Sequence, residues 1–139
     1  MKSCMLKKVL VILIPICVLN GETIARLVKV EGNVYLKRLG MSTFSERAKT
    51  GDPISNGDEV KVGERSFGAI IYIDDRSVIK IRENTKFSFM DTRNSRTVEL
   101  EYGTLLNDVK RKDKAKTYRI QTPVSVASVK GTKFAAIVS

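Results

Sequence analysis

Histidine is absent from this chain of 139 residues, and its two cysteines, Cys4 and Cys17, both lie within the first seventeen positions. The body of the chain therefore has no imidazole to act as a general base, no histidine and cysteine set for zinc, and no thiolate nucleophile. A disulfide framework is excluded as well, so packing alone must hold the core. These absences argue against an enzyme, and we expect no catalytic residue, no metal site and no cofactor.

A long apolar run is also missing. The run from Val9 to Leu19 has eleven residues, whereas a membrane-spanning helix needs about 20. Lysines precede it at positions 2, 7 and 8, and a basic stretch before a short apolar one is typical of a secretory signal peptide. We therefore expect residues 1–25 to form a signal helix that is cleaved after Ala25, or alternatively after Gly21.

Export to the periplasm or cell envelope of a bacterium follows from this leader, with no stable membrane span after cleavage. Two other interpretations of the leader exist. It could remain as an uncleaved anchor, or Cys17 could carry a lipid. The residue before Cys17 is Ile16, where acylation wants a small residue, so the sequence disfavours a lipid anchor.

Positive charge exceeds negative charge, with 25 lysines and arginines against 15 aspartates and glutamates, a formal net charge of +10. Such a field attracts anionic partners. One segment could bind phosphate or uronate groups as point charges, as in an anionic polysaccharide. The alternative is a solvated turn whose lysines protect a sheet edge. No aromatic residues alternate with these cations as stacking platforms, which argues against nucleic acid. The candidate anion-binding residues are Lys110, Arg111, Lys112, Lys114, Lys116 and Arg119.

From Arg26 onward the sequence shows no convincing helical period, and apolar residues alternate with polar ones instead. Short alternating runs separated by turn residues at intervals of about 8–12 residues predict an all-β fold, a flattened β-solenoid or a β-sandwich of stacked hairpins. Residues 39–56 are expected to be a long loop. The aromatic residues in the runs are expected to pack in the core. They are Phe67, Tyr72, Phe87, Phe89 and Phe134.

Two glutamates offer the best case for catalysis. Glu99 and Glu101 lie on the same side of a predicted strand, about 7 Å apart by strand rise, which is within the range of paired glycosidase carboxylates. No base, metal set or pocket accompanies them in the sequence. We therefore interpret both as solvated side chains.

Three blocks of sequence resemble the FecR-type domain. The first contains GDEV, AIIYID and SVIKI within residues 57–81, the second is VELEYG at 98–103, and the third runs from TP at 122–123 to GTKF at 131–134. The resemblance covers roughly residues 25–139. Its motif residues are interpreted as structural: Gly57, Asp58, Asp74, Gly103, Thr122, Pro123, Gly131, Thr132 and Phe134. Where the family has Asp-Gly in the first block, this chain has Asp75-Arg76, so we expect a different turn there.

The resemblance implies a non-catalytic extracytoplasmic domain that makes protein–protein contacts and is linked to signal transduction. Founding members of the family have a cytoplasmic segment and one transmembrane helix ahead of the domain, and they control a sigma factor. A signal peptide takes that place here, so the sigma-regulator role does not carry over intact. What remains is contact with an envelope protein, with binding of an anionic polysaccharide as the alternative.

The family pattern normally continues beyond Phe134 into a further hairpin, whereas this sequence ends at Ser139. We therefore expect the C-terminal strands of the domain at 26–139 to be missing. A last strand through Phe134, Ala136 and Val138 would then have an unpaired edge. Such an edge can pair with another strand, which predicts self-association or binding of a partner at the C-terminal strand.

Overall fold

The computed structural model describes residues 22–110, 117–129 and 133–138. Residues 1–21 of the predicted signal helix, which include both cysteines, lie outside the described residues, whereas its last residues from Thr23 to Ala25 belong to the first strand, β1 (Thr23–Glu31). Twelve strands and no helix occur in this part of the chain, which confirms the all-β prediction. The strands are β1 (Thr23–Glu31), β2 (Val34–Lys37), β3 (Glu46–Arg47), β4 (Pro53–Ser55), β5 (Glu59–Val62), β6 (Phe67–Tyr72), β7 (Val78–Ile81), β8 (Thr85–Asp91), β9 (Ser95–Asp108), β10 (Thr117–Gln121), β11 (Val126–Val129) and β12 (Lys133–Val138).

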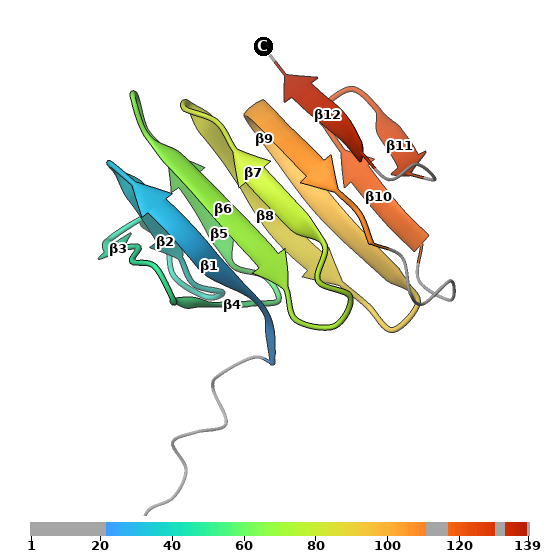
Figure 1. Cartoon of the computed structure of the whole chain (residues 1–139), viewed down its shortest axis with the longest axis horizontal. Helices are drawn as coiled ribbons and strands as arrows, with labels where there is room; N and C mark the ends of the chain where they lie inside the picture. Colours follow the sequence, from blue (N-terminus) through green and yellow to red (C-terminus); the bar gives the residue numbers. More distant parts are fainter. Residues whose placement is uncertain (1–21, 111–116, 130–132, 139) are drawn as a thin grey trace, which may run out of the picture.

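The strands form one continuous sheet that curls back on itself (Figure 1). Its order is β3-β2-β5-β8-β9-β7-β6-β1-β4, and β9 also pairs with β10 and with β12. The β9–β10 pair is parallel, and the other pairs are antiparallel. Layer A denotes β4, β1, β6, β7, the second half of β9 and β12. Layer B denotes β3, β2, β5, β8, the first half of β9, β10 and β11.

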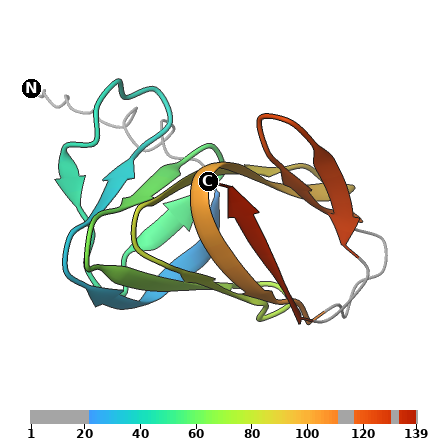
Figure 2. The same cartoon turned by 90° about the horizontal axis from the view of Figure 1, so that it is seen from above.

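Gly103 is the point at which β9 passes from one layer to the other. Before it, β9 pairs with β8 in layer B, and from it onward β9 pairs with β12 in layer A. Gly103 has a φ of +105°, and a Cβ there would overlap the side chain of Thr85. Glycine alone satisfies both conditions. Figure 2 shows β9 curving between the layers, with β12 and the β10–β11 hairpin diverging beyond it.

The alternating run before Tyr102-Gly103 predicts a strand that ends at this pair and a second strand that begins at Leu105. The structure has one strand there, because β9 continues through both as a strand of 14 residues. Gly103 bends the chain without interrupting the pairing. The predicted loop at 39–56 likewise contains the short strands β3 and β4, which pair with β2 and β1.

The core lies between the two layers. Tyr72, Phe87 and Phe89 are almost fully buried and meet edge to face, with centroid distances of 6.1 Å for Tyr72–Phe89 and 5.1 Å for Phe87–Phe89. Each such side chain contributes roughly 1.5–3 kcal/mol when buried. Three of the predicted core aromatics are therefore confirmed. Phe67 is instead half-buried on the outer side of layer A, and the side chain of Phe134 is outside the described set.

Candidate interaction surfaces

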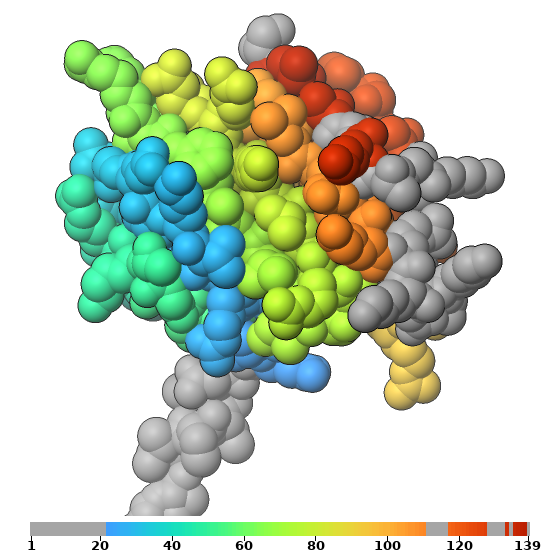
Figure 3. Space-filling model, viewed as in Figure 1, coloured from blue at the N-terminus to red at the C-terminus, as the bar shows by residue number. Residues whose placement is uncertain are grey.

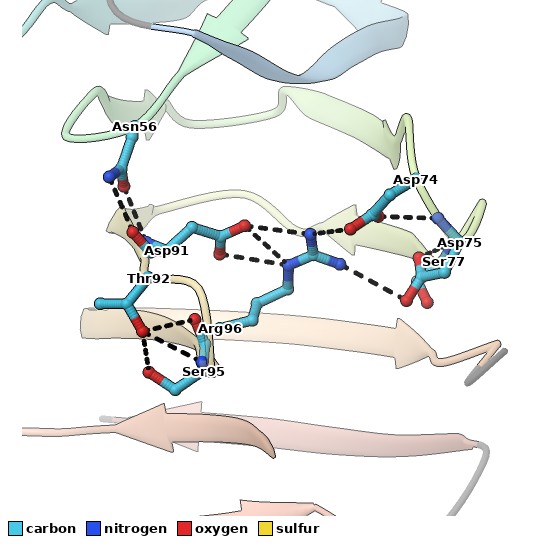
Figure 4. Close-up of polar contacts among 8 residues, drawn as sticks. All are labelled: Asn56, Asp74, Asp75, Ser77, Asp91, Thr92, Ser95 and Arg96. Atoms are coloured by element: carbon cyan, nitrogen blue, oxygen red, sulfur yellow. Dashed lines mark hydrogen bonds and ion pairs between the residues drawn. The ribbon is translucent and has the colours of Figure 1, made fainter. Parts of the chain in front are cut away.

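Arg96, near the start of β9, has a side chain that is only 4% exposed, and three carboxylates surround its guanidinium group (Figure 4). Its Nη2 lies 2.8 Å from Asp74 and 3.0 Å from Asp91, and its Nη1 lies 3.4 Å from Asp75. The guanidinium carbon is 3.7 Å from the centroid of the Tyr72 ring. These five residues are referred to below as the Arg96 cluster.

The cluster joins two hairpins from opposite layers. Asp74 and Asp75 come from the β6–β7 turn in layer A, whereas Asp91 and Arg96 flank the β8–β9 turn in layer B. The backbone of Asp91 is held by the side chain of Asn56, which both donates to its carbonyl oxygen and accepts from its amide. The cluster therefore ties the layers together at one end of the molecule.

The chemistry of the Arg96 cluster is structural. Burial by itself lowers the pKa of Arg96, but hydrogen bonds to Asp91 and Asp74 outweigh it, so the pKa stays above the ordinary arginine value. Each of the three guanidinium nitrogens already donates to a carboxylate. The guanidinium group of Arg96 therefore connects the two hairpins and does not serve as an anion-binding site.

A groove of about 680 Å³ lies beside the Arg96 cluster. Leu39 and Ile73 offer apolar contact in it, with exposed fractions of 73% and 49%, while Arg96 engages its two aspartates. The groove is lined by Glu22, Thr23, Ile24, Leu39, Asn56, Ile73, Asp74, Asp91, Thr92, Arg93 and Arg96.

The first family motif, Gly57-Asp58, fixes the entry to β5. Asp58 is 1% exposed, and its carboxylate accepts hydrogen bonds from the amides of Ser55 and Leu39 and from Arg38. Gly57 has a φ of +90°, and a Cβ there would meet the Leu39 side chain at 2.8 Å. Both motif residues thus hold a turn in place.

The last motif is described only in part, because Gly131 and Thr132 fall outside the described residues. Thr122 and Pro123 lie in the turn between β10 and β11, where Thr122 Oγ1 accepts from the amide of Ser125 at 3.1 Å. Proline lacks a backbone donor and is tolerated at the first position of a strand, so the sequence predicts that Thr122-Pro123 begins one, but β11 begins only at Val126. The backbone of Phe134 pairs opposite Asn107 in β9.

The predicted anion-binding segment follows β9 and leads into β10. Its first and last members, Lys110 and Arg119, are exposed, and neither makes an ion pair with a carboxylate among the described residues. Arg111, Lys112, Lys114 and Lys116 lie outside the described residues. Anion binding by this segment therefore stays a prediction.

Glu99 and Glu101, the pair considered above for catalysis, each contact a neighbouring side chain of β8. Glu99 accepts a hydrogen bond from the Ser88 hydroxyl at 3.3 Å, and Glu101 lies 3.5 Å from the Lys86 ammonium group. Both point outward from layer B. In the described part of the chain, no group of three or more metal-ligating side chains converges.

The outer face of layer A carries apolar side chains among its charged ones. Antiparallel layers commonly bury one face and present polar residues on the other. Here the cross-strand registers place a band of apolar side chains on the outer side, across β6, β7, β9 and β12. We call this band the apolar patch, and Figure 3 shows the face that carries it. Its members are Ala69, Ile71, Val78, Leu106, Ala135 and Ile137.

Cations are interspersed with the apolar patch. Lys80 lies between Ala69 and Leu106 in the same cross-strand row, and Lys133 lies opposite Asp108. Ile137, at the far side of the patch, is 69% exposed. The face has two acidic residues, Glu31 and Asp108. The cations on it outnumber them and are Arg26, Lys29, Lys80 and Lys133.

Sequence reasoning missed this surface, although a signal was present. The run FGAIIY in β6 is apolar at every position, which is typical of a strand covered on both faces. Its inner side consists of Gly68, Ile70 and Tyr72, and its outer side begins at Phe67. The edge of β12 adds to this surface, because within the described residues β12 pairs with β9 on one side only.

The family comparison agrees with the motifs. The family described as FecR protein matches residues 58–139, which is more than half of the chain. That family is regulatory, non-enzymatic and typically associated with the cell envelope. Within the described residues, no helix is both long and apolar enough to cross a membrane. Comparisons with curated proteins and with solved structures found no match. The motifs and the family match together show that the chain belongs to the FecR family.

Proposed function

We propose that this FecR-family chain is an exported, non-catalytic domain that makes protein–protein contacts in the cell envelope as part of a signalling pathway. The observation that supports the proposal is the apolar patch on the outer face of layer A. Ile71, Val78 and Leu106 each leave part of their apolar surface exposed to water, which is unfavourable. A partner that covers these side chains would remove their remaining apolar area from water.

The partner's chemistry follows from the charges around the patch. Arg26, Lys29, Lys80 and Lys133 would meet an apolar surface that bears aspartate or glutamate. A second copy of the chain would present the same positive face, so like charges disfavour pairing of two layer A faces. The edge of β12 that pairs with no other described strand offers a separate contact, at which a strand of the partner or of another copy can add to the sheet.

Photo-crosslinking from single positions in the full chain, expressed in its native cell, tests the proposal. A crosslinker at Leu106 in the apolar patch should capture an envelope protein, whereas one at half-buried Ser88 on the opposite face should not. Replacing Ile71 by Glu should abolish the Leu106 adduct, since a carboxylate would repel the acidic partner. Equal capture from both positions, or capture of cytoplasmic proteins alone, would overturn the proposal.

The second candidate function is binding of an anionic envelope polysaccharide through residues 110–119. The observation that favours it is the exposure of Lys110 and Arg119 at the two ends of that segment. Affinity for an anionic polysaccharide should fall as salt rises, and replacing Lys110 and Arg119 by Ala should weaken it. Replacing exposed Lys49 and Arg93 by Ala is the matched control for net charge. Equal losses in both double variants would show that the segment is not the site.

A further inference from the structure

The outer face of layer B carries a row of hydrogen-bonding side chains that crosses five strands. The registers place Lys37, Glu59, Ser88, Glu99 and Gln121 side by side in β2, β5, β8, β9 and β10. With neighbouring strands about 4.8 Å apart, the row is about 19 Å long. This face is therefore an extended polar strip, in contrast to the apolar outer face of layer A.

Part of this strip is hollowed. A groove of about 320 Å³ lies over β8 and β9, a size within the range of small-ligand sites, roughly 300–1,000 Å³. Thr122 and Pro123, in the β10–β11 turn, bound it on one side. Cross-strand ion pairs also occur on sheet faces that bind nothing. This face differs from them in having the β10–β11 turn as a wall along one side of the groove. The polar side chains that line the groove are Glu59, Lys86, Ser88, Glu99, Glu101, Gln121 and Thr122.

An aromatic ring lies next to the groove. Phe44, from the segment between β2 and β3, is within 5.4 Å of the Nζ of Lys86, which itself lines the groove. The ammonium groups of Lys37 and Lys61 lie 5.5 Å and 5.8 Å from the same ring centroid. Attraction between these cations and the ring fixes Phe44 on the outer face of layer B.

The row and the groove lining carry no excess of positive charge. Lys37 pairs with Glu59 at 2.8 Å, and Lys86 pairs with Glu101 at 3.5 Å. Among the residues of the row and the groove lining, Lys37 and Lys86 are outnumbered by Glu59, Glu99 and Glu101, so there is no excess of positive charge in the groove with which to select phosphate or uronate groups. Its alternating donors and acceptors instead match hydroxyl groups, each of which can both donate and accept.

We propose that the outer face of layer B binds a neutral saccharide chain. Phe44 packs against the apolar C–H face of one sugar ring, while Glu99 accepts hydrogen bonds from sugar hydroxyls and Gln121 donates to them. Neutral sugars are favoured over anionic ones because carboxylates outnumber ammonium groups in the groove lining. The site lies on the face opposite the apolar patch, so it does not depend on the protein–protein function proposed above.

Titration calorimetry of the full chain with soluble hexasaccharides tests the proposal. The neutral probes are hexamers of N-acetylglucosamine, of β-1,3-linked glucose and of α-1,4-linked glucose, and the charged probe is hexagalacturonate. At least one neutral hexamer should bind with a Kd of about 1 mM or tighter, and its affinity should not change between low and high salt. Failure of all three neutral hexamers to bind, or salt-sensitive binding of hexagalacturonate alone, overturns it.

Variants locate the binding. Phe44→Ala should weaken binding about tenfold, the loss expected for one aromatic contact, and Glu99→Gln, which keeps the side-chain size, should weaken it as well. Phe67→Ala is the matched control, because Phe67 has Lys29 over its ring at 5.8 Å on the opposite face. Unchanged affinity in both Phe44→Ala and Glu99→Gln, or an equal loss in Phe67→Ala, overturns the assignment. If Phe44→Ala does not fold, the Glu99→Gln result decides alone.

Discussion

The guanidinium group of Arg96 lies flat enough on the Tyr72 ring to be 3.7 Å from its centroid, while Nε of Arg96 donates to both carboxylate oxygens of Asp91. Arginine suits this position because its planar group stacks on an aromatic ring and binds a carboxylate in a fork at the same time. Arg96 and Tyr72 come from different layers, so losing their contact should lower the stability of the whole domain.

Replacing Arg96 by Ala should lower the free energy of unfolding by about 3–5 kcal/mol, because the buried carboxylate of Asp91 would lose the counter-charge and the hydrogen bonds that Arg96 supplies. Arg96→Lys keeps the charge but loses the stacking and the fork, so it should lose less, though more than about 1 kcal/mol. Urea unfolding measures both. Arg65→Ala is the control, since its side chain is 88% exposed, and it should change stability by less than about 0.5 kcal/mol. Similar losses for Arg96→Ala and Arg65→Ala would contradict the structural role.

The protein should lose stability in alkali through two buried tyrosines. Burial raises the pKa of Tyr72 well above its ordinary value, and burial also raises the pKa of Tyr118. The pKa of each tyrosine is higher in the folded state than in the unfolded state, where it is about 10. Above pH 10 the unfolded chain therefore loses the phenol proton first, and the stability that is fully present below about pH 10 is lost as the pH rises. Above about pH 10, each of the two tyrosines should lower the free energy of unfolding by about 1.4 kcal/mol per pH unit.

Tyr72→Phe separates this effect from general alkaline unfolding. The variant cannot ionise at position 72, so its free energy of unfolding should fall less steeply above about pH 10 than that of the original chain. Urea titrations at successive pH values give both slopes. Parallel curves would show that ionisation of Tyr72 does not govern alkaline stability.

Gly103 should tolerate no side chain. Gly103→Ala combines a positive φ with an overlap on Thr85, and we expect a loss of more than about 3 kcal/mol, typical of overpacking added to backbone strain. Gly51→Ala is a matched control, because Gly51 has a similar φ of +97° and nothing within 4 Å of the added Cβ. It should lose only about 1–2 kcal/mol. The difference between the two free energies of unfolding, each the urea midpoint multiplied by the slope m, gives the cost of the overlap. Equal losses would show that β9 can shift away from Thr85.

The local parts of the fold could be predicted from the sequence. Apolar residues alternate with polar ones at Glu59–Val62 and Val78–Ile81, and turn residues flank both runs, so period 2 predicts strands there. Their bounds are those of β5 and β7. Gly103 was recognised as a motif residue. Its role in carrying β9 between layers depends on the position of Thr85, which is distant in sequence.

The candidate surfaces were harder to predict, because they depend on which side of a strand faces outward. Every position of β6 is apolar, so alternation could not tell Ile70 from Ile71. Arg96 carried a weak signal, since it shares an inward face with Val98 and Leu100 by period 2. Its three carboxylates lie in two other hairpins, and only tertiary pairing brings them together.

The β6–β7 turn can be improved by one substitution. Because aspartate tolerates left-handed backbone better than most residues, the sequence predicts that Asp74-Asp75 makes this turn, but the residue with left-handed backbone is Arg76, with a φ of +65°. Arg76 thus occupies the position of the glycine in the family's Asp-Gly turn. Glycine relieves the strain of left-handed backbone at position 76, and this gain exceeds the extra conformational entropy that glycine gives the unfolded chain. Arg76→Gly should therefore raise the free energy of unfolding by about 0.5–1 kcal/mol. Arg76→Ala keeps a Cβ and should give no gain. Thermal unfolding compares them, and a stabilised Arg76→Ala would mean that the arginine side chain itself is unfavourable.

The mature chain should begin near Glu22. Ala25 is fully buried and pairs with Tyr72 on one side and Ile54 on the other, so cleavage after Ala25 would remove a core residue and the first pairs of β1. Cleavage after Gly21, the alternative site, would leave β1 whole. Intact-mass measurement of the exported protein should therefore find Glu22 as its first residue. A chain that begins at Arg26 should be less stable by about 1.5–3 kcal/mol, the contribution of burying Ile24 and Ala25. Recovery of an equally stable product beginning at Arg26 would show that the start of β1 contributes little to the fold.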